Sequence, residues 1–240
     1  MDDYPPLLNA SIHALAGLLL PAEGLDDVLA RISSLSVATV EGCDYAGVSL
    51  VEPNALRTVG ETADIVRELD LMQYEIGEGP CVSAIREADK APIFEIGSMS
   101  EDSRWPAFSE RAMEKGVSSL LAHTLGIRET GVLGALNLYA RRPHAFRPED
   151  GQVATVFATH AAIALANARG LADATRRVRE LEEGIASRDI IGQAKGILME
   201  RERCTDDEAF AILTRVSQHL NRKLRDVAQD VIQSSRPRPK

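Results

Sequence analysis

The sequence predicts an α+β domain, with an antiparallel sheet and flanking helices, followed by a coiled-coil helix and an all-α domain of three helices. Three observations support this fold class. Two strand patterns follow one another without an intervening helix in residues 117–140, which favours antiparallel pairing. Helical periodicity then runs without a proline from Glu149 to about Arg203. Two shorter amphipathic helices come after Thr205.

The elements of the first domain can be placed from the period of their apolar residues. Two helical patterns open the chain, and strands joined at Pro53-Asn54 predict a hairpin. In chain order the helices are "PLLNASIHALAGLLL", "GLDDVLARISSLSVATVE", "ADIVRELDLM", "CVSAIREA" and "WPAFSERAMEKG", and the strands are "YAGVSLVE", "ALRTVGE", "APIFEI", "VSSLLAHTLGI" and "GVLGALNLYA". We expect the domain boundaries at 1–168, 169–187 for the linker helix, 188–235 for the three-helix domain, and 236–240 for a disordered tail.

Composition bounds the class of protein. The chain has 240 residues, of which 45% are hydrophobic and 26% charged, as in soluble globular proteins of two domains. No apolar run approaches the roughly 20 residues of a membrane span, and the amino terminus "MDDYPPLLNA" is acidic where a signal peptide is basic. We therefore expect a cytoplasmic protein without a membrane partner.

Cysteine and histidine usage gives no sign of a metal or a disulfide framework. The three cysteines, Cys43, Cys81 and Cys204, are far apart, and the five histidines lack ligand spacing. We expect no metal. Cys81 could be a redox or adduct site, but only Arg86 near it would lower its pKa, so burial in the core is the favoured interpretation.

Charge is divided unevenly along the chain. The formal net charge is -9, but residues 186–240 carry eleven Lys/Arg against eight Asp/Glu. The rest of the chain has 16 basic and 28 acidic residues. A basic end on an acidic body indicates an anionic partner for that end, although solvated charged helix faces are common.

The long helix carries a coiled-coil pattern. Apolar residues recur in alternating steps of three and four, which is the a/d seam of a coiled coil and predicts a parallel homodimer. An intramolecular helix packed on its own domain is the alternative interpretation. The residues of the predicted seam are Leu171, Ala174, Val178, Leu181 and Ile185.

Two glycines interrupt the helix after the seam. Gly192 and Gly196 lie in "RDIIGQAKGILMER", and each costs a helix roughly 1 kcal/mol against alanine. Small residues allow close approach, either by the last helix of the same bundle or by a nucleic-acid backbone. Packing by the last helix is the favoured interpretation.

The carboxyl-terminal helices have clear start signals and apolar faces. Thr205 with Glu208 forms a capping box before the second helix. Two apolar stripes follow and predict the bundle core: Phe210, Leu213, Val216 and Leu220 on the second helix, and Leu224, Val227, Ala228, Val231 and Ile232 on the third. With Phe210 in the core, no aromatic platform for stacking bases remains.

This carboxyl-terminal segment closely resembles the ANTAR domain, a small three-helix RNA-binding module of bacterial transcription antiterminators. The resemblance covers about Ser187 to Ile232. The matching residues are Ala194-Lys195-Gly196, Met199, Glu208-Ala209-Phe210, Leu213, Ser217, Leu224 and Asp226-Val227-Ala228. It implies binding to RNA with two adjacent hairpins, which prevents a competing terminator hairpin from forming, so that RNA polymerase is affected only through the transcript.

The basic and polar residues of this domain are the candidate RNA contacts. Proteins read looped RNA through unpaired bases and the backbone, so cations for phosphates and amides or hydroxyls for bases are the expected groups. The candidates are Arg188, Gln193, Lys195, Gly196, Arg201, Ser217, Gln218, Asn221, Arg222, Lys223 and Arg225.

The preceding region resembles a GAF domain of the kind paired with ANTAR in actinobacterial regulators. The resemblance lies in "QYEIGEGPCVSAI", "RWPAFSERAMEKGVSSLLAHTL" and "GVLGALNLYA". It implies either a small-molecule ligand of unknown identity, as in GAF domains that bind cyclic nucleotides or tetrapyrroles, or a dimerisation unit. We expect Trp105 to be a buried anchor and Arg104 to pair with Asp102. No enzyme motif is present, so we expect no catalysis.

These features lead to one functional hypothesis and one alternative. The chain is expected to be an RNA-binding antitermination regulator in which the GAF domain acts through a dimeric coiled coil. The alternative is a signalling scaffold whose carboxyl-terminal helices bind a protein partner, or DNA. The third helix carries cations only at its start, which is unlike the recognition helix of a DNA-binding helix-turn-helix.

Overall fold

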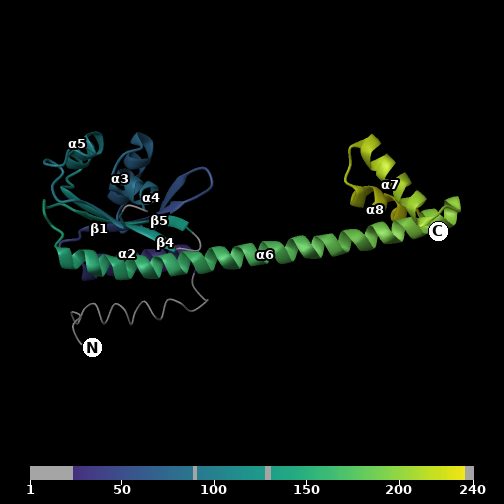
Figure 1. Cartoon of the computed structure of the whole chain (residues 1–240), viewed down its shortest axis with the longest axis horizontal. Helices are drawn as coiled ribbons and strands as arrows, with labels where there is room; N and C mark the ends of the chain where they lie inside the picture. Colours follow the sequence, from purple (N-terminus) through teal and green to yellow (C-terminus); the bar gives the residue numbers. More distant parts are fainter. Residues whose placement is uncertain (1–23, 89–90, 128–130, 236–240) are drawn as a thin grey trace, which may run out of the picture. The chain divides into compact units, whose positions relative to one another are not determined.

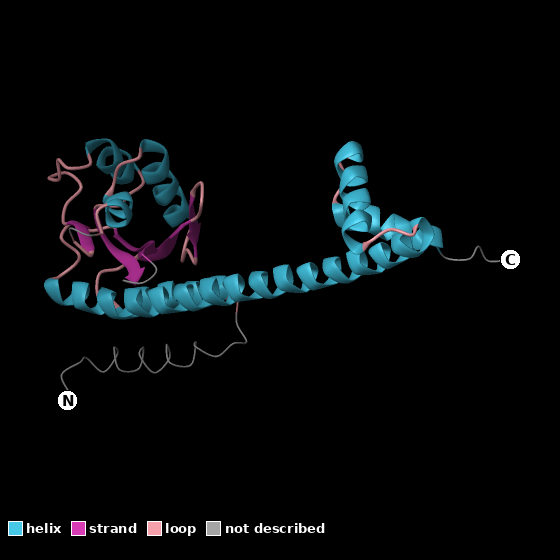
Figure 2. Cartoon of the chain, turned by 45° about the vertical axis from the view of Figure 1, so that its right-hand side comes forward, coloured by secondary structure: helices cyan, strands magenta, loops and turns pink. Residues whose placement is uncertain are grey.

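The computed structural model describes residues 24–88, 91–127 and 131–235 (Figure 1). The chain forms two compact units that divide after Gly170. The long helix α6, Pro148–Glu202, contributes to both units (Figure 2). Two predicted segments, the helix "PLLNASIHALAGLLL" and the tail 236–240, lie outside the described residues.

The amino-terminal unit is built on a five-stranded sheet in the order β2-β1-β5-β4-β3, with every neighbouring pair antiparallel. The strands are β1 (Tyr45–Val51), β2 (Leu56–Val59), β3 (Ile93–Ile96), β4 (Ser119–Ile127) and β5 (Gly131–Ala140). The helices are α2 (Leu25–Thr39), α3 (Asp64–Ile76), α4 (Pro80–Arg86), α5 (Pro106–Glu114) and the first part of α6. The predicted fold class is confirmed, with a strand or helix at every predicted position in the described part of this unit.

Local turn chemistry sets the ends of these elements. The predicted hairpin at Pro53-Asn54 is present, because Val51 pairs with Leu56 and the Glu52 N–H donates to the Ala55 carbonyl at 2.9 Å. Gly77 ends α3 with a left-handed φ of 74°, a conformation that favours glycine.

Side chains alternate between two cores, one on each face of the sheet. Leu121 of β4 packs in the core that contains Leu29 of α2 and Phe157 of α6. Leu120, the neighbouring residue, packs in the second core with Leu69 of α3. This period of two is what a sheet buried on both faces requires, and Figure 1 shows α3, α4 and α5 on one face and α2 with α6 on the other.

The carboxyl-terminal unit contains the last part of α6 together with α7 (Asp206–Leu220) and α8 (Leu224–Ser235). Its small core has four buried members, Ala194 from α6, Leu213 from α7, and Val227 and Ala228 from α8. The predicted capping box is present: the Glu208 N–H donates to Thr205 Oγ1, and the Thr205 N–H donates to the Glu208 carboxylate.

Among the described residues, no helix has the length and apolar character needed to cross a membrane.

Candidate nucleic-acid interface

Six of the predicted RNA contacts lie at the turn between α7 and α8. Three of them, Ser217, Asn221 and Arg222, stabilise the turn. Asn221 has a left-handed φ of 49° and ends α7. The Arg222 N–H donates to the Ser217 carbonyl at 3.0 Å, and the Ser217 hydroxyl donates to the Arg222 carbonyl at 2.6 Å. Asparagine adopts this backbone conformation more readily than most residues, which explains its place at the end of the helix.

The role of the Asn221 side chain can be separated from its backbone role. The Asn221→Gly variant is expected to melt like the parent by circular dichroism, because glycine also accepts a positive φ. The Asn221→Val variant is expected to lose about 1 kcal/mol. If both variants melted equally early, the side chain would be needed for folding. If the glycine variant melted normally but bound RNA less well, the side-chain amide would be a contact.

The cations of the turn differ in how strongly they are engaged within the chain. Arg222 forms an ion pair with Asp230 at 2.6 Å, and this hydrogen bond raises the pKa of its guanidinium. The Nε atom of Arg225 lies 3.9 Å from Oδ1 of Asp226. No ion pair involves the exposed Lys223 within the described part of the chain, so this lysine is the cation of the turn that a phosphate can bind with least competition.

A groove connects this turn to the first helix of the bundle. Lys223, Leu224 and Arg225 line it on one side, and Ser187 and Ile191 of α6 lie on the other. Arg188 follows Ser187 in the chain and is exposed, but it does not line the groove. Glu180 and Glu183 also line the groove and would repel phosphates at its other end.

The remaining predicted contacts lie apart from the turn. Lys195 pairs with Asp206 at 2.6 Å, and Arg201 donates to the carbonyl of Ser234 at 3.3 Å. Gln193 and Gly196 are exposed on α6. The structure therefore brings Ser217, Gln218, Asn221, Arg222, Lys223 and Arg225 together but does not assemble the whole predicted set.

The prediction that Phe210, Val216 and Leu220 belong to the bundle core is wrong. Their exposed fractions are 45%, 38% and 50%, whereas Leu213 of the same stripe is buried. The ring of Phe210 lies beside Lys195, whose Nζ is 5.9 Å from the ring centroid. An exposed aromatic ring is thus present, and helical periodicity missed it because it identifies a face without showing how far a neighbour covers it.

The favoured interpretation of Gly192 and Gly196 is also wrong. A Cβ added at either glycine would meet no described atom within 4 Å, so neither α7 nor α8 packs against them. Ala194 is the residue of this segment that faces the bundle, and it is fully buried. The close approach that would explain the glycines is not made within the described chain.

The residues of the predicted coiled-coil seam are exposed on α6. Leu171, Val178, Leu181 and Ile185 have exposed fractions of 71%, 54%, 68% and 63%. Ala174 is also exposed. Large apolar side chains in a continuous row on a helix indicate a surface that another molecule covers.

The amino-terminal unit contains a buried polar network where the sheet meets α3. Asp70 is fully buried and accepts hydrogen bonds from the Tyr139 hydroxyl, from Asn137 Nδ2 at 3.0 Å and from the Thr58 hydroxyl at 2.9 Å. The Ser49 hydroxyl also donates to the Asp70 carboxylate, at 3.4 Å. Burial raises the pKa of the Asp70 carboxyl to about 6 although these hydrogen bonds oppose the shift.

Cys81 belongs to the same network, as a structural residue. Its N–H donates to Gln73 Oε1 at 2.9 Å, and its thiol donates to the Ser49 hydroxyl at 3.0 Å. Burial, together with the charge of Asp70, raises the pKa of this thiol to about 12. The favoured prediction of a buried cysteine is confirmed, because Cys81 is fully buried. A thiol whose pKa is raised in this way carries little thiolate at neutral pH.

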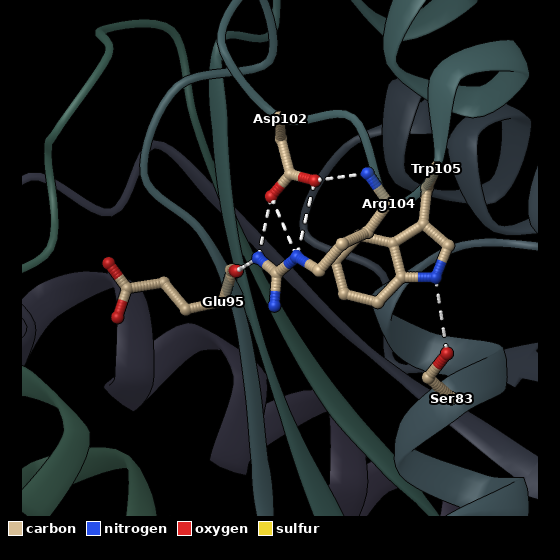
Figure 3. A network of polar contacts seen from close by, with 5 residues as sticks. All are labelled: Ser83, Glu95, Asp102, Arg104 and Trp105. Carbon is tan, nitrogen blue, oxygen red and sulfur yellow. Dashed lines mark hydrogen bonds and ion pairs between the residues drawn. The ribbon is translucent and has the colours of Figure 1, made fainter.

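The segment around Trp105 is held by an ion pair and by ring stacking (Figure 3). The Arg104 guanidinium bonds Asp102 through two nitrogens, with distances of 2.5 and 3.1 Å to Oδ2, and also donates to the Glu95 carbonyl. It stacks 4.3 Å from the indole centroid, while the Trp105 Nε1–H donates to Ser83 at 3.2 Å. Both predictions, the buried tryptophan and the Arg104–Asp102 pair, are confirmed.

The described residues contain no group of three or more His, Cys, Asp or Glu that could hold a metal ion.

Partial burial would raise the pKa of Asp102, but the hydrogen bonds and charge of Arg104 hold it below its ordinary value. This pairing satisfies the carboxylate within the loop.

Comparison with known proteins agrees with both units. Residues 22–166 match the family model of the GAF domain, and residues 179–232 match that of the ANTAR domain. No curated protein matches the chain.

Two solved structures illustrate the similarity of fold. The GAF domain of an Acinetobacter phosphoenolpyruvate-protein phosphotransferase is 14% identical, with 71% of this chain and 99% of that chain covered and a TM-score of 0.51. The reduced form of fRMsr of Staphylococcus aureus is 15% identical, with 67% and 96% covered and a TM-score of 0.52. The chain therefore belongs to the GAF family and, with an ANTAR domain after the GAF domain, has the architecture of a GAF-ANTAR regulator.

Proposed function

We propose that this protein is an antitermination regulator whose ANTAR domain binds RNA carrying two adjacent hairpins and prevents a terminator hairpin from forming. The regulator acts in the cytoplasm on the nascent transcript, and it affects RNA polymerase only through that transcript. It has no catalytic activity of its own.

The exposed cations of the α7–α8 turn carry this proposal. Lys223 and Arg225 line one groove, with Arg222 beside them, on a domain of the ANTAR family. Phosphate contacts by Lys and Arg supply most of the affinity of proteins for nucleic acids, and amides and hydroxyls nearby can read unpaired bases. Asn221 and Gln218 supply amide groups at the same turn.

A dimer would explain why the RNA target carries two hairpins. The exposed seam from Leu171 to Ile185 supports a parallel homodimer, in which each copy holds one hairpin of the pair. Since α6 is continuous from the GAF domain into the ANTAR domain, a change in the geometry of the GAF dimer would move the ANTAR domains. A small-molecule ligand of the GAF domain is the proposed source of that change.

A binding titration tests the proposed function directly. The full chain is titrated with a two-hairpin RNA, a loop-scrambled RNA and duplex DNA at two salt concentrations. Loop-dependent RNA binding that weakens steeply with salt is the expected result. Equal binding to all three nucleic acids, or binding to none, would contradict the proposal.

Lys223 is expected to contact phosphate. The Lys223→Ala variant should bind the two-hairpin RNA roughly 3- to 10-fold more weakly, with a salt slope reduced by about 1. Arg215→Ala is the matched control, because this arginine is also exposed but lies within α7, outside the turn. An equal loss of affinity in both variants would indicate a diffuse charge effect without a specific contact.

The exposed Val216 and Leu220 favour a second candidate function, in which the carboxyl-terminal helices bind a protein partner. This scaffold function predicts that Val216→Ser and Leu220→Ser leave RNA binding unchanged while abolishing a protein interaction. If the two serine variants lost RNA binding and Lys223→Ala did not, the RNA surface would be apolar and the turn would not be the site.

A further inference from the structure

The apolar seam of α6 has a regular continuation into the ANTAR domain. Leu171, Val178, Ile185, Gly192 and Met199 follow one another at intervals of seven residues. Residues seven apart share a helix face, with a drift of about 20° per step that a left-handed supercoil absorbs. Met199 is 37% exposed, so the row of exposed positions does not end at Ile185.

The rest of the bundle leaves this face free. Ala194, which is fully buried against the core, lies two positions from both Gly192 and Gly196. A separation of two residues on a helix is about 200°, so the glycines point away from α7 and α8. A Cβ at either position would meet no described atom within 4 Å, in agreement with this geometry.

The charges near this face favour a protein occupant over RNA. Lys195 is already paired with Asp206 at 2.6 Å, and the first turn of α7 also carries Asp207 and Glu208. Beside Lys195 lies the half-exposed ring of Phe210. Apart from Arg188, this surface is apolar or has acidic neighbours, so it is a poorer phosphate site than the α7–α8 turn, whereas it suits the apolar face of another helix.

The flanking charges fit a second copy of the same helix. In the heptad that places Leu171 and Val178 at position a, Arg177 is at g and Glu182 is at e of the next heptad. In a parallel, in-register dimer the Arg177 of each copy lies next to Glu182 of the other, which is the usual arrangement of interhelical ion pairs. Both residues are exposed, and neither has an ion pair within the described part of the chain.

We propose that the seam of the dimer continues through Gly192 to Met199, so that a second copy of α6 covers the glycine face of the ANTAR domain. The missing side chain at Gly192 lets the two helices approach closely between Arg188 and Lys195, which take the d positions on either side of it; the ammonium of Lys195 is held by Asp206 of its own chain at 2.6 Å. This inference rests on the dimer of the proposed function and extends it: the two ANTAR domains are held at a fixed spacing, and RNA is bound at the α7–α8 turns.

Cysteine cross-linking of the full chain tests this contact without RNA. Val178→Cys, Gly192→Cys and Gln193→Cys are each introduced together with Cys204→Ser, while Cys43 and Cys81 stay because they are buried. Position a of a parallel dimer brings two Cα atoms within disulfide range, so Val178→Cys and Gly192→Cys are expected to form covalent dimers at similar rates under mild oxidation. Gln193→Cys, on a neighbouring exposed face, is expected to react at least tenfold more slowly.

The outcomes separate this inference from the proposed function. Cross-linking through Val178→Cys without cross-linking through Gly192→Cys would overturn the extended seam and leave the dimer intact. Failure of both would overturn the dimer as well. If two-hairpin RNA slowed the Gly192→Cys reaction selectively, RNA would be the occupant of this face and the inference would be wrong. Loss of RNA binding in the titration, with cross-linking retained, would refute only the RNA function.

Discussion

Replacing Asp70 by alanine is expected to lower the free energy of unfolding of the GAF domain by about 3 kcal/mol relative to the Asp70→Asn variant. The side chain accepts hydrogen bonds from Tyr139, Asn137 and Thr58 in a fully buried site. Alanine leaves these donors unpaired, whereas asparagine keeps one acceptor oxygen and can donate to the hydroxyls, which rotate.

Trp105 makes this measurement specific to one domain. It is the only tryptophan of the chain and is buried in the core that also contains Leu69. Urea unfolding followed by tryptophan fluorescence therefore reports the GAF domain alone. Equal unfolding midpoints for the alanine and asparagine variants would contradict the role assigned to the network.

The same carboxyl is expected to make stability depend on pH. Its pKa is about 6 in the folded protein against 3.8 for the ordinary group. Since the folded state binds the proton more tightly, this stabilisation is complete below pH 4 and is lost as the pH rises through 6. The stability of the parent relative to Asp70→Asn should fall by about 2 kcal/mol between pH 4 and pH 7. A difference that stayed constant over this range would show that Asp70 is not the titrating group.

Features set by neighbours in the sequence could be predicted, and those set by distant segments could not. The capping box depends on Thr205 and Glu208, three residues apart, so its pattern is visible directly. The burial of Asp70 depends on Asn137 and Tyr139, which are 67 and 69 residues away. In the sequence alone, an aspartate within "VRELDLM" has the pattern of a solvent-facing helix residue.

The candidate site shows the same limit. Periodicity correctly placed Leu213 and Val227 in the bundle core, because residues at helical spacing share a face. It could not show that the third helix leaves Phe210 and Leu220 half exposed, since coverage depends on the length and position of α8. For the same reason, the spacing of Gly192 and Gly196 in the sequence cannot show that they face away from the bundle.

Disrupting the seam is expected to have the largest effect on RNA binding. The Val178→Glu variant places two like charges against each other in an apolar interface and should make the full chain monomeric. Its affinity for a two-hairpin RNA should fall by about 100-fold or more, because linked binding of two hairpins by two copies gains that much from effective concentration. Its affinity for a single hairpin should change little.

Ala172→Glu is the matched control for this variant, because it adds the same charge to an exposed position of the same helix away from the seam. Sedimentation measures the oligomeric state, and Trp105 fluorescence checks that the GAF domain remains folded. A monomer that still bound the two-hairpin RNA tightly would mean that one ANTAR domain holds both hairpins. An equal loss for the single hairpin would mean that each RNA site needs residues of both copies, so that dimerisation would complete the site itself in addition to linking two sites.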